Sequence, residues 1–314
     1  MKKVIAIIGP TAVGKTKVSL ELASRFNGEI INGDSMQIYR GLDIGTAKIK
    51  KEEMKGIPHH LFDIKNPDES FSVYEFQRLV RGKIEEISSR DHLPFIVGGT
   101  GLYIQAVLYD YQFQETAKDL SVRKQLEEKA KTEGIHSLFQ QLQEIDPEYA
   151  EKIHPNNERR VIRALEVYLT TGKPISTIVK EQRQEMVYDG IIIGLTMERE
   201  KLYQRINDRV DQMFAEGLLE EARTLYKKRL IHSQAAQAIG YKELFPYFDG
   251  TLTLEEAKNL LKQNTRRFAK RQLTWFRNKM DVTWFDMTDE EQFEKKIEEI
   301  SHFLAGKLDS LSNT

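Results

Sequence analysis

The stretch Gly9-Pro-Thr-Ala-Val-Gly-Lys-Thr16 decides the fold of this chain. It fits the pattern G-x-x-x-x-G-K-[ST], a loop whose backbone N–H groups surround the phosphates of a bound ligand. Residues 4–8 before it form a β-branched apolar run, as a buried parallel strand requires, and the apolar positions of residues 18–26 follow a helical period. This order of strand, loop and helix argues against a chance match. The loop predicts a phosphorylated ligand without identifying it.

Four positions explain how the loop would hold an anion. Gly9 and Gly14 allow backbone angles that a side chain hinders. The free N–H groups and the start of the following helix favour negative charge. Lys15 adds a positive charge, and the hydroxyl of Thr16 stands where this motif binds Mg²⁺. We therefore expect a phosphate site with Mg²⁺ as cofactor and Thr16 as the metal ligand of the protein.

The composition bounds the class of protein. Of the 314 residues, 40% are hydrophobic, which is ample for a core, and the net charge of −1 gives no global attraction to nucleic acid. The absence of cysteine excludes disulfides and thiolate metal sites and agrees with a reducing compartment. The apolar run at 4–8 is too short for a signal peptide, and no stretch approaches the roughly 18 apolar residues of a membrane span. We expect a cytoplasmic protein without membrane contact.

Apolar strand patterns alternate with amphipathic helical patterns along most of the chain. After residues 4–8, strands are expected at residues 28–33, 61–64, 93–97, 191–195 and 282–285. Between 116 and 188 the pattern changes, because charged helical segments follow one another without a strand signal. The order predicts an α/β fold in which residues 1–115 and 189–314 form a doubly wound parallel sheet and residues 116–188 form an all-helical insertion.

A carboxylate follows the second expected strand. Asp34 lies at its C-terminal end, the edge of an open α/β sheet at which ligands bind. Phosphate-loop hydrolases and kinases usually carry a Mg²⁺-binding acid after another apolar strand, but the best such strand here, 93–97, ends in the glycine-rich residues 98–101. Asp34 is therefore a candidate metal ligand or general base. The alternative is an ordinary turn aspartate.

Two helical segments are rich in arginine. The long helix expected up to residue 279 has no acid from 266 to 280. Five of its basic residues in this stretch fall within one sector of the helix: Arg266, Arg267, Lys270, Arg271 and Arg277. The insertion adds Arg159, Arg160 and Arg163. Such faces are often merely solvated, but two of them favour a polyanion larger than a nucleotide, such as a folded RNA.

Seven blocks together resemble those of a known family, the tRNA dimethylallyltransferases, also called tRNA isopentenyltransferases. They are residues 9–16, 34–37, 72–76, 98–103, 159–166, 237–243 and 265–277, in the order of the family. The first block is generic, whereas the set is specific and spans most of the chain. Val13 departs from the family, which has a small residue there, often Ser. This departure should matter little, because the loop binds largely through its backbone.

The resemblance implies a reaction and a fold. It implies transfer of a dimethylallyl group from dimethylallyl diphosphate to N6 of the adenosine immediately 3′ of the anticodon, tRNA position 37. It also implies a P-loop kinase-like parallel sheet core whose loop holds the diphosphate of the prenyl donor instead of ATP. The helical insertion would help to grip the tRNA anticodon stem-loop. We expect a monomer.

The resemblance further assigns roles to residues. Asp34 matches the proposed base of the family, which would accept the N6 proton, and Thr16 would hold Mg²⁺. The donor diphosphate would be bound by Gly9, Pro10, Thr11, Ala12, Val13, Gly14, Lys15, Thr16 and Arg209. The tRNA would contact Asp34, Ser35, Met36, Gln37, Thr100, Arg123, Arg159, Arg160, Arg266, Arg267 and Arg271.

Three other functions share some of these features. A P-loop kinase acting on a small nucleoside or metabolite explains the loop and the sheet, but neither the insertion nor the basic helices. An adenylate isopentenyltransferase uses the same donor with a free nucleotide as acceptor, and the long insertion argues against it. A non-catalytic RNA-binding protein leaves the intact loop and Asp34 unexplained.

Overall fold

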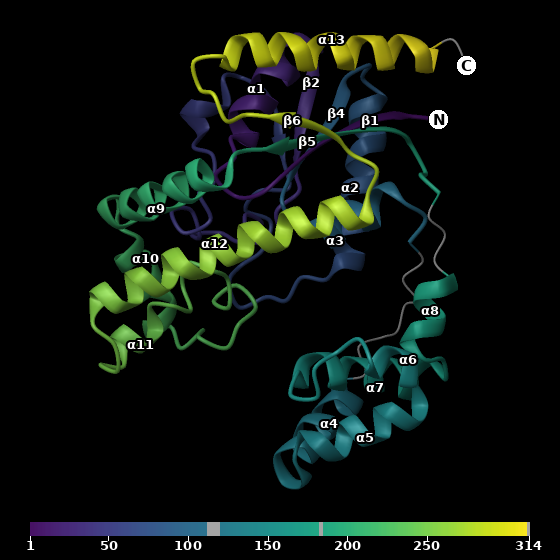
Figure 1. The fold of residues 1–314 in the computed structure, drawn as a ribbon, viewed down its shortest axis with the longest axis vertical. Helices are drawn as coiled ribbons and strands as arrows, with labels where there is room; N and C mark the ends of the chain where they lie inside the picture. The colour runs from purple at the N-terminus through teal and green to yellow at the C-terminus, as the bar shows by residue number, and fades with distance from the viewer. Residues whose placement is uncertain (112–119, 182–184, 313–314) are drawn as a thin grey trace. The chain divides into compact units, whose positions relative to one another are not determined.

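The computed structural model describes residues 1–111, 120–181 and 185–312, which belong to two compact units (Figure 1). The sheet unit consists of Met1–Tyr109 and Met186–Thr314, and the helical unit of Asp110–Glu185. The boundary expected at 116 lies outside the described residues. At the other boundary, Tyr188 is buried in the core of the sheet unit, so this unit begins again before the expected residue 189.

Six strands among the described residues form one parallel sheet in the order β3-β2-β4-β1-β5-β6. Their bounds are β1 Lys3–Ile8, β2 Gly28–Asn32, β3 His59–His60, β4 Leu93–Gly98, β5 Asp189–Thr196 and β6 Thr283–Asp286. The α/β fold with a parallel sheet is therefore confirmed. One expected strand, 61–64, is wrong: Leu61 and Asp63 have φ of 64° and 54°, which is incompatible with an extended strand, and the edge strand lies just before them.

Helices cover both faces of this sheet (Figure 1). The helices of the sheet unit are α1 Lys15–Arg25, α2 Val73–Ser88, α3 Gly101–Leu108, α9 Arg199–Glu216, α10 Leu218–Lys227, α11 Phe245–Phe248, α12 Leu254–Lys279 and α13 Phe293–Ser312, with a short 3₁₀ helix at Lys51–Met54. Successive side chains of β1 point to opposite faces of the sheet. Val4, Ala6 and Ile8 pack in the core that the sheet forms with α2 and α3. Ile5 and Ile7 face a second core with α1 and α13. The sheet is thus buried on both faces, as the continuous apolar strands predicted.

The helical unit has a core of its own. Its elements are α4 Leu120–Glu133, α5 Ile135–Ile145, α6 Pro147–Ala150, α7 Glu158–Thr171 and α8 Ile175–Glu181. Apolar residues of α4, α5 and α7, among them Leu126, Leu142 and Leu165, form one buried cluster. In neither unit is a described helix long and apolar enough to cross a membrane.

Candidate active site

The phosphate loop joins β1 to α1 at the carboxyl edge of the sheet. Gly9 and Gly14 have φ of 151° and 101°, and a Cβ on Gly9 would lie 2.6 Å from the carbonyl oxygen of Leu195. Both glycines are therefore needed for the path of the loop. Val13 is buried among core residues, so its side chain does not compete with a ligand for space. Val13, in place of the small residue that the resemblance leads us to expect, thus packs into the core.

Lys15 follows Gly14 as the first residue of α1. Its Nζ donates hydrogen bonds to the carbonyl oxygens of Gly9 at 3.1 Å and Pro10 at 2.8 Å. Burial lowers the pKa of the Lys15 ammonium to about 8; the Asp34 carboxylate opposes this change and the Arg209 guanidinium adds to it. A bound anion would stabilise the protonated form.

Two adjoining cavities open beside the loop. A polar pocket of about 370 Å³ is lined by loop residues including Lys15 and Thr16, and by Arg205 of α9. A mainly apolar pocket of about 320 Å³ is lined by side chains that include Val210 and Met213 of α9. The residues that line both are Thr11, Ala12, Asp34, Thr46, Ala47, Arg209 and Phe268. The pair of pockets can hold a molecule with an anionic end and an apolar end.

Arg209 projects from α9 at the junction of the two pockets. Its guanidinium has no hydrogen-bond or ion-pair partner among the residues that the structure describes, and it lines both cavities. Burial lowers the pKa of this guanidinium, and the neighbouring Arg205 lowers it further, while Asp34 and Glu216 oppose the change. An anion in the polar pocket would supply the missing partner.

Asp34 lies at the same junction, directly after β2. Its Oδ1 accepts the N–H of Met36 at 2.8 Å, and its own N–H donates to Oδ1 of Asn32 at 2.8 Å. This turn fixes the carboxylate, while Oδ2 has no partner within the described part of the chain. The turn role and a chemical role are therefore compatible, because one oxygen holds the backbone and the other remains available.

A family model described as IPP transferase matches residues 37–279. The chain belongs to the IPP transferase family. A tRNA dimethylallyltransferase of Anoxybacillus flavithermus is 61% identical over 99% of this chain and 99% of its own length. Another, of Geobacillus thermodenitrificans, is 60% identical over 98% of each chain. The family expected from the seven sequence blocks is confirmed.

Solved structures of the family have the same fold. The full-length tRNA isopentenylpyrophosphate transferase of Bacillus halodurans is 56% identical and superposes with a TM-score of 0.76, covering 100% of this chain and 99% of its own. A eukaryotic dimethylallyltransferase, described as acting on tRNA, is 33% identical with a TM-score of 0.86, covering 99% of this chain and 80% of its own.

Four other residues expected to contact tRNA gather around Asp34. Ser35 donates its N–H to Oγ1 of Thr100 at 3.1 Å, and both residues line the apolar pocket with Met36. Gln37 lines the polar pocket, and its Nε2 donates to the carbonyl oxygen of Thr46 at 3.0 Å. The segments that follow β2 and β4 therefore meet at one edge, as parallel strands require.

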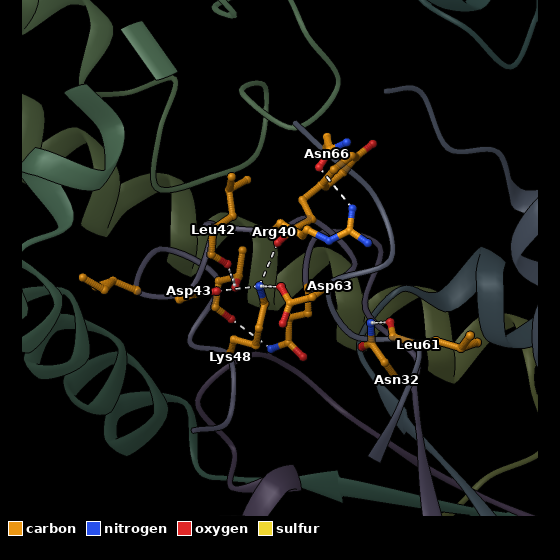
Figure 2. Close-up of polar contacts among 12 residues, drawn as sticks. Asn32, Arg40, Leu42, Asp43, Lys48, Leu61, Asp63 and Asn66 are labelled. Atoms are coloured by element: carbon orange, nitrogen blue, oxygen red, sulfur yellow. Dashed lines mark hydrogen bonds and ion pairs between the residues drawn. The ribbon is translucent and has the colours of Figure 1, made fainter. Parts of the chain in front are cut away.

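Lys48 holds the loop that includes Thr46 and Ala47, which line both pockets, and it was not identified from the sequence. Its side chain is only 5% exposed, and Nζ donates to the carboxylates of Asp43 and Asp63 at 2.6 Å each and to the carbonyl oxygen of Tyr39 at 2.7 Å. Figure 2 shows the Lys48 ammonium between the two carboxylates. This buried cation joins the loop of residues 39–48 to the loop of Asp63 and thereby holds the backbone of residues 43–48, which includes Thr46 and Ala47.

Glu221 of α10 holds the same loop from another side. Its carboxylate accepts the N–H groups of Asp43, Ile44 and Gly45 at 2.9, 3.0 and 2.9 Å. It also accepts the hydroxyl of Tyr241. A Cβ on Gly45 would lie 2.6 Å from the Tyr241 ring, so the glycine admits this ring. In the sequence, Gly45 is the only sign that its loop packs closely against other residues. Glu221 gives no such sign, because it lies in an ordinary helical pattern.

The basic residues expected to face RNA differ in their surroundings. On α12, Arg267 and Arg271 are exposed and have no ion pair with any described residue, whereas Arg266 donates to Oδ1 of Asn207 at 2.6 Å. In the helical unit, Arg159 and Arg160 are exposed on α7 without ion pairs to described residues. Arg123 of α4 instead pairs with Glu127 at 3.1 Å and with the buried Glu166 at 3.7 Å.

The donor groups at the loop fit Mg²⁺. Within the described residues no group of three or more His, Cys, Asp or Glu side chains could hold a metal. Thr16 is exposed at the start of α1 and lines the polar pocket together with Asp34. Mg²⁺ keeps several waters and binds through one or two protein oxygens plus phosphate oxygens, so this sparse set suits a Mg²⁺–diphosphate complex.

Proposed function

We propose that this protein transfers the dimethylallyl group of dimethylallyl diphosphate to N6 of adenosine 37, immediately 3′ of the anticodon in tRNA, and releases diphosphate. The chain is a member of a family of prenyltransferases whose named members modify tRNA. The observation that carries the proposal is the position of Asp34, which has one free carboxylate oxygen at the junction of a cationic pocket and an apolar pocket.

The polar pocket suits the diphosphate end of the donor. Lys15 and the unpaired Arg209 supply positive charge, and the N–H groups at the start of α1 favour an anion. Mg²⁺ held by Thr16 would neutralise further charge on the diphosphate when it is bound. Because charge develops on the diphosphate as it leaves, cations that are already in place stabilise the transition state more than the ground state.

The apolar pocket suits the five-carbon chain and the approach of a purine. Its walls include Val210 and Met213 of α9 and Phe268 of α12. Asp34 borders this pocket and would stand near the reacting nitrogen. The adenosine must leave its stack to enter, which costs a few kcal/mol.

The transfer is a substitution at the first carbon of the prenyl chain. The lone pair of N6 forms the new C–N bond, and the C–O bond breaks with its electron pair leaving on the diphosphate. The N6 proton passes to the free oxygen of Asp34, which makes the weakly nucleophilic exocyclic amine a better nucleophile. Lys15 and Arg209 hold the leaving group.

The RNA would be held by the exposed cations of α12 and by the helical unit. Arg267 and Arg271 lack carboxylate partners in the described chain, as do Arg159 and Arg160. Unpaired arginines suit the phosphates of an anticodon stem-loop. For Arg123 we propose a smaller role, because Glu127 and Glu166 already engage it. A cytoplasmic location follows from a tRNA substrate.

The test is a transfer assay with labelled dimethylallyl diphosphate and tRNA that lacks the modification. We expect label in N6-isopentenyladenosine at position 37 and release of diphosphate. Label incorporated into free adenylate instead of tRNA would identify an adenylate isopentenyltransferase. Consumption of ATP with a small phosphorylated product, and no prenyl transfer, would identify a kinase.

A further inference from the structure

Gln272 of α12 connects two loops of the candidate active site through its side-chain amide. Its Oε1 accepts the N–H of Thr11 in the phosphate loop at 2.9 Å. Its Nε2 donates to the carbonyl oxygen of Gly99, which follows β4, at 3.0 Å. The side chain is 5% exposed and borders the polar pocket. One buried amide thus satisfies a donor of one loop and an acceptor of the other.

The glycines after β4 are explained by the packing of α12 against this segment. A Cβ on Gly99 would lie 2.1 Å from Nε2 of Gln272, and a Cβ on Gly101 would lie 2.1 Å from Cδ1 of Trp275, one turn further along α12. The glycine-rich segment therefore admits the long helix. The space beside Gly99 and Gly101 is filled by side chains of α12, so these two glycines do not make room for a phosphate group.

The hydrogen bond to Thr11 also determines which backbone N–H groups of the phosphate loop can bind an anion. This N–H is directed at the helix and is used by Gln272, so it is not available to an anion. The loop conformation that presents the remaining N–H groups depends on this anchor. Since a misplacement of about 1 Å can reduce a rate about 100-fold, such an anchor is relevant to catalysis.

The outer side of the same helix carries the cations proposed to bind RNA. Arg267 and Arg271 are exposed, and Arg271 also lines the apolar pocket. Gln272 follows directly in the sequence and is buried. The outer side of α12 therefore carries exposed cations, and its inner side contacts the phosphate loop through Gln272.

We infer that Gln272 is a positioning residue that aligns the diphosphate-binding loop and the segment after β4 with the RNA-facing helix α12. The inference rests on the proposed function for the identity of the two ligands. Gln272 acts through Thr11 and Gly99 and takes no part in the bond changes. The geometry predicts that its loss harms donor placement and the rate, while the cations that would bind tRNA remain.

The first test uses Gln272→Met, which keeps the length and apolar stem and removes both hydrogen bonds. We expect the single-turnover rate at saturating donor and tRNA to fall about 10- to 100-fold. The affinity for inorganic pyrophosphate, measured by calorimetry without RNA, should fall as well, while the affinity for tRNA stays that of the wild type. Gln263→Met is the matched control, because Gln263 is exposed on the same helix, and it should change none of these values.

The second test moves the amide without removing it. In Gly99→Ala the new Cβ displaces Nε2 of Gln272, so this variant should reproduce the defect. Gln272→Ala removes the atoms that the new Cβ meets, so the double variant Gly99→Ala/Gln272→Ala should be no worse than Gln272→Ala alone. Circular dichroism and the melting temperature verify that each variant is folded.

The outcomes separate the inference from the proposed function. Wild-type rate and pyrophosphate affinity in folded Gln272→Met overturn the inference, as does a loss of rate that only follows the folded fraction. Additive effects of Gly99→Ala and Gln272→Ala overturn it too. If the wild-type protein binds pyrophosphate but modifies no tRNA, the proposed function fails, and a weakened pyrophosphate affinity in Gln272→Met still supports the positioning role.

Discussion

The hydroxyl of Tyr241 donates a 2.7 Å hydrogen bond to Glu221, and the same carboxylate accepts three consecutive backbone N–H groups, those of residues 43–45. Tyr241 is fully buried, and its pKa is raised by burial and by the neighbouring Glu221 charge, so its hydroxyl stays protonated and remains a donor. The loop that includes Thr46 and Ala47, both at the junction of the two pockets, is thereby tied to α10. The wall of the active site depends on a residue that touches no proposed ligand.

Replacement of Glu221 should therefore destabilise the protein. Glu221→Leu leaves three N–H groups and a buried hydroxyl without their acceptor, which should lower the free energy of unfolding by about 1–3 kcal/mol for each donor that water cannot reach. Denaturant unfolding measures this change. Glu220→Leu, at an exposed position of the same helix, should stay within about 0.5 kcal/mol of the wild type. An equal effect of the two substitutions would contradict the assigned role.

Lys15 should make donor binding depend on pH. Its pKa of about 8 means that the ammonium is lost as the pH rises through this value, and the affinity for dimethylallyl diphosphate should fall over the same range. Bound diphosphate favours the cation, so binding near pH 8 should take up protons, which calorimetry in buffers of different ionisation enthalpy detects.

The Lys15→Ala variant tests this assignment. It should stay folded, bind the donor more weakly than the wild type at neutral pH, and lose the dependence on pH around 8. The lowered pKa of Lys15 also affects stability. Between pH of about 8 and the ordinary lysine pKa near 10.4, the unfolded chain binds more protons at this group than the folded chain does. The contribution of Lys15 to folding therefore becomes more favourable as the pH rises through this window. Donor affinity unchanged by the substitution would refute the assignment of the loop.

Asp34→Asn should separate three roles for this residue. The amide oxygen can still accept the N–H of Met36, so the turn and the fold should persist. Donor and tRNA should bind as before, while single-turnover transfer falls by roughly 10²–10⁴, as expected for a lost general base. Rescue by added Mg²⁺ with an early loss of donor affinity would indicate a metal ligand. A lower melting temperature with a normal rate per folded molecule would indicate a turn residue.

The exposed cations of α12 should contribute to tRNA binding through phosphates. In a variant with Arg267→Glu and Lys270→Glu, tRNA affinity should fall, and the slope of log affinity against log salt should become less steep by about one per lost contact. Arg271 is left in place because it also lines the apolar pocket. A control with Lys295→Glu and Lys307→Glu on α13 makes the same change in net charge. If both variants bind tRNA alike, the α12 face is only solvated.

Much of the fold could be predicted because its signals are local. The phosphate loop, the apolar strands and the arginines of α12 are each contained in a short stretch. The alternation of strands with helices predicts a parallel sheet, and the carboxyl ends of parallel strands lie at one edge. The edge strand was misplaced because two non-glycine residues, Leu61 and Asp63, adopt left-handed backbone angles. Such conformations depend on the surrounding loops, and neither residue type reveals them.

The sequence by itself determined the family, the parallel α/β core, the phosphate loop and the carboxylate of Asp34 after the next strand. Each of these features depends on residues that are consecutive in the chain. Only the tertiary structure decided how the loops of the site are held. Gln272 and Thr11 are 261 positions apart, Glu221 and Asp43 are 178 apart, and both contacts join polar atoms at particular distances and angles. Hydrogen bonds between distant segments leave no periodic trace in a sequence, since any polar residue in an amphipathic helix satisfies the same local pattern. They exist only once packing has brought the partners together.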